Sequence, residues 1–249
     1  MMMAHHSDTT LAQPTSEGSP GGLHPAQRLQ RILLAACILL APLSITLYIL
    51  AWPENPAPVV TGSQAAPIAT SLMAGPLGNQ LHFIGAIAAS FFLPLGYLGM
   101  ALLGARRAPW LALWSAALAL VGWIPWSALI AIDALAYQIG QAGATPQLAA
   151  LWTEFNRSPV MLAYLLIYVV GHLISAVLLA VMLGRLRLVP LWAAWAFALT
   201  SPLTMVYFAD HDLTARYVLR YLICALWSAG AVPAALAMLT RKDLPQQPA

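Results

Sequence analysis

Charged side chains are scarce in this chain of 249 residues. Only 8% of the residues are Asp, Glu, Lys or Arg, whereas 61% are hydrophobic. A soluble domain has about 25% charged and about 45–50% apolar residues, which lets it cover its surface with solvated groups. This composition excludes an ordinary soluble globule and indicates an integral membrane protein with several spans. The net charge of +3 is not gathered into a basic face, which argues against nucleic acid as a partner.

Cysteine and lysine are also rare. The two cysteines, Cys37 and Cys224, lie in apolar runs at different expected depths, which argues against a disulfide or a cysteine-based metal site. The only lysine, Lys242, follows the last apolar run, so a retinal Schiff base inside the membrane is excluded. The motifs HExxH, GxSxG, the P-loop and paired CxxC are absent, so no common motif assigns a reaction.

Six apolar runs are present, each about 20 residues or longer, which is enough to cross a hydrocarbon core of about 30 Å. They predict an all-α bundle of six transmembrane helices over residues 32–52, 81–105, 109–135, 160–184, 188–209 and 217–240. We expect a single membrane domain over 28–242, a disordered cytoplasmic tail over 1–27 and a short tail over 243–249. Pro125 is expected to kink the third span, because proline has no N–H to donate.

The polar connection between the third and fourth spans contains another helix signal. Thr145 can cap a helix and Pro146 can occupy its first turn. Apolar residues then recur at helical spacing, at Leu148, Leu151, Trp152 and Phe155. This pattern predicts a short amphipathic helix over about 146–156. Two placements stay open for it: in the membrane interface, or as a lid packed on the bundle.

Basic residues gather at alternate turns between the spans. With the N-terminus on the cytoplasmic side, Arg157, Arg216 and Arg220 lie at the outer face and all other basic residues at the inner face. This bias is typical of the positive-inside rule. It predicts a multi-pass protein of the plasma (inner) membrane with both termini in the cytoplasm. The inner set comprises Arg28, Arg31, Arg106, Arg107, Arg185, Arg187, Arg241 and Lys242.

A single acid follows a long uncharged stretch of the third predicted span. No charged residue occurs from Pro109 to Ile132, and Asp133 then follows with apolar residues on both sides. A carboxylate near the centre of a bilayer costs about 2–3 kcal/mol. Such a cost is tolerated when the group faces water, a partner or a cavity. Asp133 is therefore the first candidate for a functional residue.

Counting residues from the inner arginines estimates the depth of the other polar groups. His82, Asp133 and His211 come out roughly 36–39 Å above the inner charged layer at about 1.5 Å per residue. Asp210 and Asp212 flank His211. His172 lies roughly 20 Å above that layer by the same count, near the midplane. These depths predict a polar pocket that opens to the outer side and has His172 at its floor.

This predicted pocket has two chemical interpretations. The candidate catalytic residues are Asp133, His172, His82, His211 and Asp210, since histidine transfers protons near neutral pH and a carboxylate can orient it. His82, His211 and Asp212 also provide nitrogen and oxygen ligands for a divalent metal ion. Haem is disfavoured, because ligation by two histidines requires them at one depth and His82 and His172 differ by roughly 15 Å. In the simpler alternative, residues 210–212 form a solvated loop and His82 anchors a helix end.

Three functions are compatible with the sequence. The first is a membrane-embedded enzyme, a hydrolase, isomerase or cyclase, that uses an outward-facing Asp/His site on a lipid-like or isoprenoid-like substrate. The second is a small proton-coupled transporter or channel subunit in which Asp133 and His172 relay protons. The third is an accessory subunit of a membrane complex. The expected partners are the lipid bilayer and an apolar or lipid-like small molecule, and oligomerisation stays open.

Overall fold

The computed structural model describes residues 25–54, 66–209 and 212–240. All regular elements in these ranges are α-helices, and the described part contains no strand. Six helical segments are long and apolar enough to cross a membrane, with α3 and α4 together forming one of them. The predicted all-α, multi-pass bundle is therefore confirmed. The helices are α1 (Pro25–Ala51), α2 (Ala66–Gly104), α3 (Pro109–Trp123), α4 (Trp126–Gln141), α5 (Pro146–Asn156), α6 (Pro159–Arg185), α7 (Leu191–Ala209) and α8 (Leu213–Thr240).

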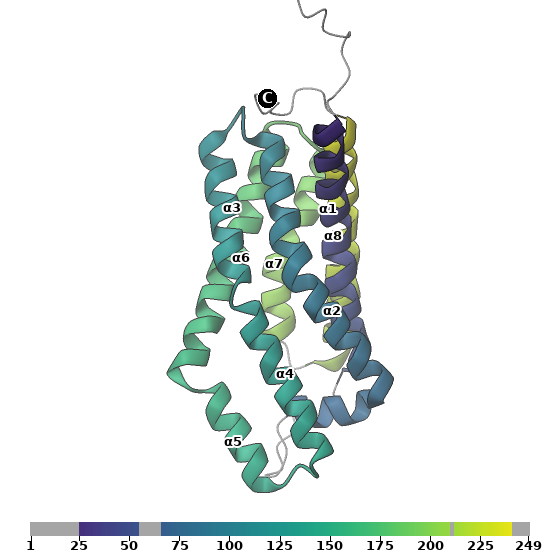
Figure 1. The fold of residues 1–249 in the computed structure, drawn as a ribbon, viewed down its shortest axis with the longest axis vertical. Coiled ribbons are helices and arrows are strands. Elements are labelled where there is room, and N and C mark those ends of the chain that lie inside the picture. The colour runs from purple at the N-terminus through teal and green to yellow at the C-terminus, as the bar shows by residue number, and fades with distance from the viewer. Residues whose placement is uncertain (1–24, 55–65, 210–211, 241–249) are drawn as a thin grey trace, which may run out of the picture.

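The long helices run up and down along one axis (Figure 1). α1 packs against α2 and α8, α3 packs against α6, and α7 lies between α6 and α8. The beginning of α1 and the end of α8 lie at the same end of the bundle (Figure 1). The opposite end carries α5, the second half of α4 and the first turns of α2 (Figure 1). This second end is the one that holds the candidate site.

Two boundaries differ from the predicted ones. α1 begins at Pro25, so residues 25–27 are helical rather than part of a tail. α2 begins at Ala66 and contains a break at Gly75, which has φ 65° and ψ −178°. A glycine takes this positive φ without a clash between Cβ and backbone, and Pro76 can then restart the helix with its fixed φ. Residues 66–74 thus form a helical piece at the site end. The sequence favours a proline-rich loop over 53–79, with a short interfacial piece over 65–74 as an option.

The third predicted span is two helices rather than one. α3 ends at Trp123, and α4 begins at Trp126 with Pro125 as its N-cap. Pro125 cannot donate the hydrogen bond that would continue α3, because it has no N–H. The predicted kink is therefore present as an interruption of the helix at residues 124 and 125, both of which keep right-handed helical backbone angles. It gives α4, which carries Asp133, its own direction (Figure 1).

The predicted amphipathic helix is α5. Thr145 is its N-cap and accepts a hydrogen bond from the Leu148 N–H at 3.4 Å. Trp152 is buried, and its indole N–H donates to the Ile132 carbonyl of α4 at 3.1 Å. The exposed fractions of Leu151 and Phe155 are 60% and 48%. α5 therefore packs on α4 through Trp152, while its contact with a membrane interface stays a prediction.

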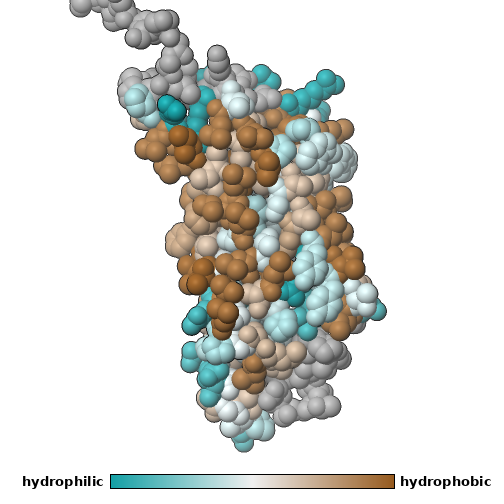
Figure 2. All heavy atoms as spheres, turned by 90° about the vertical axis from the view of Figure 1, so that its right-hand side faces the viewer, coloured by the Kyte–Doolittle hydropathy of each residue, from teal (hydrophilic) through white to brown (hydrophobic). Residues whose placement is uncertain are grey.

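Apolar side chains cover much of the outside of the bundle. Leu33, Ile84 and Leu166 are 56%, 57% and 64% exposed. Figure 2 shows hydrophobic residues along most of one face, with hydrophilic ones mainly towards its two ends. Inside, small residues let backbones approach closely: a Cβ on Gly122 would lie 2.6 Å from the His172 backbone nitrogen. This close packing of α3 on α6 is typical of helix contacts in membranes.

Candidate functional site

A cavity of about 440 Å³ lies between α1, α2, α4, α6, α7 and α8. This volume falls in the range of pockets for small molecules, about 300–1,000 Å³. Charged and polar side chains line its outer part, and aromatic and aliphatic side chains line the part nearer the middle of the bundle. The first group includes Glu54, His82, Asp133, Arg216 and Arg220, and the second includes Ile45, Trp126, Tyr168, Ile223 and Trp227.

His82 and Asp133 form a contact across two helices. His82 Nε2 of α2 lies 3.3 Å from Asp133 Oδ2 of α4. On its other side, His82 Nδ1 lies 2.9 Å from the backbone carbonyl oxygen of Tyr48 in α1. The Tyr48 hydroxyl donates to the same Asp133 oxygen at 3.2 Å. The depth count had placed His82 and Asp133 at one level, and the structure brings them together.

The hydrogen-bond partners of the two His82 ring nitrogens indicate which of these nitrogens carry protons. A carbonyl oxygen only accepts hydrogen bonds, so His82 Nδ1 carries a proton and donates it to Tyr48. The 3.3 Å contact between Nε2 and Asp133 is a hydrogen bond when one further proton lies on the ring or on the carboxyl group. The pair is either an imidazolium with a carboxylate or an imidazole with a carboxylic acid. In both cases the two side chains share one proton. The Asp133 side chain is 19% exposed and lines the cavity, so this proton lies beside it.

Aromatic stacking holds the His82 ring in place. Trp52 lies parallel to it, with 3.9 Å between the ring centroids and an interplanar angle of 7°. The Trp52 indole N–H donates to the Asn79 side-chain oxygen at 3.0 Å. The Asn79 amide in turn donates to the carbonyls of Ser71 and Gly75, each at 2.7 Å. The break of α2 at Gly75 therefore supports the position of His82 through Asn79 and Trp52.

His172 lines the same cavity from α6 but does not contact the His82–Asp133 pair. Its Nε2 lies 3.0 Å from the Ser201 hydroxyl oxygen of α7. Its ring lies parallel to Tyr168, at 5.1 Å and 8°, and edge-on to Trp123 at 5.2 Å. His172 is 1% exposed, and its Nδ1 has no hydrogen-bond partner in the described part of the chain. The sequence predicted His172 below the outer polar groups, and it lies among the aromatic residues.

The remaining predicted residues have different outcomes. Asp210 and His211 lie outside the described residues. Asp212 is exposed, and its Oδ1 accepts a hydrogen bond from the Ala215 N–H at 2.7 Å in the first turn of α8. Among the described residues, no group of three or more His, Cys, Asp or Glu is placed to hold a metal ion. The proposed metal set of His82, His211 and Asp212 includes an undescribed residue and stays a prediction.

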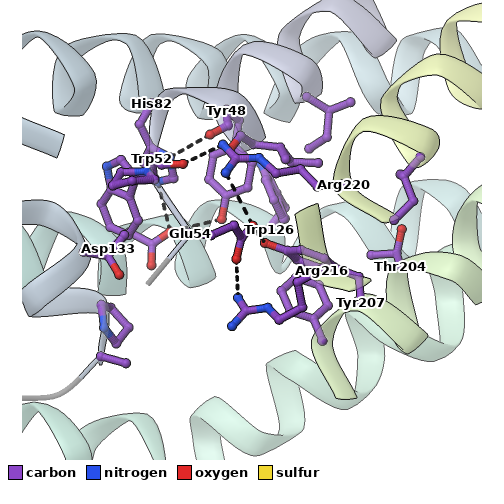
Figure 3. A pocket seen from close by; sticks show the side chains of 18 of the residues that line it. Tyr48, Trp52, Glu54, His82, Trp126, Asp133, Thr204, Tyr207, Arg216 and Arg220 are labelled. Atoms are coloured by element: carbon purple, nitrogen blue, oxygen red, sulfur yellow. Dashed lines mark hydrogen bonds and ion pairs between the residues drawn. The ribbon is translucent and has the colours of Figure 1, made fainter. Parts of the chain in front are cut away.

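A buried ion cluster that the sequence did not predict lies across the cavity from Asp133 (Figure 3). Glu54, which follows α1, is 4% exposed. Its carboxylate oxygens lie 2.7 Å from Arg216 Nη2 and 3.4 Å from Arg220 Nη1, both of α8. The Tyr207 hydroxyl of α7 donates to Glu54 Oε1 at 2.7 Å. These residues are far apart in the chain, and the sequence analysis considered only the two arginines among them, as outer basic residues.

Arg220 also fixes the end of α1. Its guanidinium group donates to the backbone carbonyls of Ile49 and Trp52. The last carbonyls of a helix lack partners within the helix and carry its negative dipole end, so a buried cation is well placed there. The same turn carries Tyr48 and Trp52, which contact His82. Arg220 lies inside the predicted span 217–240. A charged residue within a span usually has a functional or structural role, so this position was the signal in the sequence that could have indicated the cluster.

Comparison of the chain with protein-family models, with curated proteins and with solved structures finds no match.

Proposed function

We propose that this protein is a membrane-embedded enzyme in which the His82–Asp133 pair acts as an acid–base group on an apolar or lipid-like molecule. The observation that carries the proposal is the 3.3 Å contact between His82 Nε2 and Asp133 Oδ2 beside the cavity. A positioned acid or base contributes about 10²–10⁴-fold to a reaction rate. The pair is held from two sides, by Tyr48 and by the stack of Trp52 on His82.

The aromatic walls favour isomerisation or cyclisation over hydrolysis. Protonation of a carbon–carbon double bond produces a carbocation, and return of a neighbouring proton to the pair completes the reaction without net proton consumption. The faces of tryptophan and tyrosine attract cations. Trp126, Tyr168 and Trp227 line the cavity with such groups. A substrate of this type dissolves in the bilayer, so it can reach a cavity within the bundle from the lipid.

The transporter alternative has less support, because a relay needs polar groups on both sides of the cavity. Inward of His172, the buried hydroxyls of Ser115, Ser175 and Thr200 each donate to a carbonyl of their own helix, three residues earlier. In the described residues, the next buried histidine, acid or base in that direction is Arg31, near the beginning of α1. This arrangement favours a cavity that is closed on the inner side.

The test compares the wild type with Asp133→Asn in liposomes made from the total lipids of the producing cells. We expect mass spectrometry to detect a lipid or isoprenoid converted by the wild type, and Asp133→Asn to slow the conversion by at least about 100-fold. Glu154→Gln, an exposed change on α5, is the matched control and should retain full activity. Equal conversion by Asp133→Asn and Glu154→Gln, or no conversion by the wild type, would reject the proposal.

A further inference from the structure

Positive charge exceeds negative charge at the outer part of the cavity. The guanidinium groups of Arg216 and Arg220 share a single carboxylate, that of Glu54. With one shared proton between them, His82 and Asp133 are neutral as a pair in either placement of that proton. The described lining residues therefore leave one positive charge without a matching acid. A buried charge without a partner is costly, so a site of this kind favours an anion.

The guanidinium group of Arg220 already has hydrogen-bond partners within the protein. It is 4% exposed, and its two amino groups contact Glu54 and the carbonyls of Ile49 and Trp52. Its position therefore depends on α1 and leaves little freedom to bind a ligand. This arginine is a structural anchor at the outer end of α1.

Arg216 is different, because its side chain is 30% exposed and its acidic partner in the described structure is Glu54 alone. The guanidinium carbon of Arg216 lies 5.3 Å from the centre of the Tyr207 ring. The Arg216 Nε has no hydrogen-bond partner among the residues that the structure describes. Asp212, the nearest acid along α8, is exposed and caps that helix. Arg216 is therefore the positively charged residue of the cavity that can still bind an anion in addition to Glu54.

We propose that the cavity binds an anionic amphiphile, whose carboxylate or phosphate group pairs with Arg216 and whose hydrocarbon chain enters the aromatic part. This inference rests on the proposed function, because it assigns a substrate class to the same cavity. Arg216 precedes Trp227 by about three turns of α8, which is roughly 16 Å at about 1.5 Å per residue. The cavity thus has a charged end and an apolar end, as an amphiphile requires.

In this orientation, the carbon atoms that react with the His82–Asp133 pair lie near the charged head group of the amphiphile. Figure 3 shows the Arg216, Glu54 and Asp133 side chains around one space, with Tyr48 and Trp126 beside it. An anion on Arg216 would bring the first carbons of the chain towards Asp133, while the end of the chain points to Trp227 and His172. Glu54 holds the arginine from the opposite side, and Tyr207 holds Glu54. The ion cluster therefore selects the head group and sets how far the chain enters.

The test measures binding rather than turnover. Protein in nanodiscs of zwitterionic lipid is titrated with dodecanoate, dodecyl phosphate, dodecanol and dodecylammonium, each with a terminal bromine that quenches tryptophan fluorescence. We expect at least one anion to bind about 10-fold or more tightly than the alcohol, a difference of about 1.4 kcal/mol. The comparison of carboxylate with phosphate identifies the head group.

Arg216→Gln should reduce that preference to less than about 3-fold, a difference of less than about 0.7 kcal/mol. Arg216→Lys should keep it in part, and Arg157→Gln, an exposed arginine outside the cavity lining, should keep it in full. Asp133→Asn separates the two proposals, because it should lose turnover and keep anion binding. Equal affinity of the wild type for anion and alcohol, tighter binding of the ammonium probe, or an unchanged preference in Arg216→Gln would overturn the inference. If Arg216→Gln does not fold, the wild-type preference and its response to Arg216→Lys decide the question.

Discussion

The change Glu54→Gln should strongly destabilise the folded protein. It removes the one carboxylate that two arginines share, in a position that is 4% exposed. Removal of one partner from a buried ion pair costs about 3–5 kcal/mol, because the other charge stays buried without compensation. Arg216 is 30% exposed on its side chain, so water compensates part of its charge. The glutamine oxygen can also still accept from Tyr207. We therefore expect a loss near the lower limit, about 3 kcal/mol.

The free energy of unfolding can be measured in mixed micelles with an increasing fraction of sodium dodecyl sulfate, followed by tryptophan fluorescence. Glu154→Gln is the control, because Glu154 is exposed on α5, and it should change stability by less than about 0.5 kcal/mol. The double change Glu54→Gln/Arg216→Gln should cost less than the two single changes added together, because it removes one of the stranded cations. If Glu54→Gln costs no more than the control, the cluster contributes nothing to stability and the reasoning is wrong.

Three further predictions concern packing, capping and orientation. Gly122→Ala should destabilise the bundle by about 1–3 kcal/mol, because the new Cβ would lie 2.6 Å from the backbone of α6. Gly184→Ala is the control and should cost less in the same unfolding assay, because the nearest atom to its Cβ is a side-chain carbon at 3.3 Å. Thr145→Ala should speed amide exchange in the first turn of α5 through loss of about 1 kcal/mol of capping, whereas Thr145→Ser should not; equal exchange in both would contradict the cap. In a cysteine-free background, a membrane-impermeant maleimide should label Glu154→Cys but not Arg106→Cys on intact cells, and the reverse pattern would overturn the predicted cytoplasmic termini.

The main features of the fold were predictable because they depend on local physical requirements. Apolar run length determined the number of spans, and the missing N–H of Pro125 indicated where the third one breaks. Thr145 and Pro146 marked the beginning of α5 correctly. The helical piece at 66–74 lies in a proline-rich connection whose prolines are typical of a loop, so a short interfacial piece over 65–74 was only an option there. Only the positive φ at Gly75 shows how it joins α2.

The candidate site was predictable only in part. Counting residues along helices placed His82 and Asp133 at one depth, since rise per residue is nearly constant. It could not show that they touch, or that Tyr48 contributes a carbonyl to one and a hydroxyl to the other. Glu54 was not among the residues that the sequence singled out as candidates. Its arginines are more than 160 positions away along the chain, at Arg216 and Arg220.

The sequence alone determined the class of protein and the number of spans, and it predicted that His82 and Asp133 lie at one level. Hydropathy and helix rise act along a helix axis, so they need no knowledge of neighbours. The tertiary structure decided which side chains meet, because this depends on the rotation of each helix and on how closely helices approach. Close packing of Gly122 on α6 and the break at Pro125 set those rotations around the cavity. The contact between His82 and Asp133, and the single carboxylate between two arginines, are consequences of that packing.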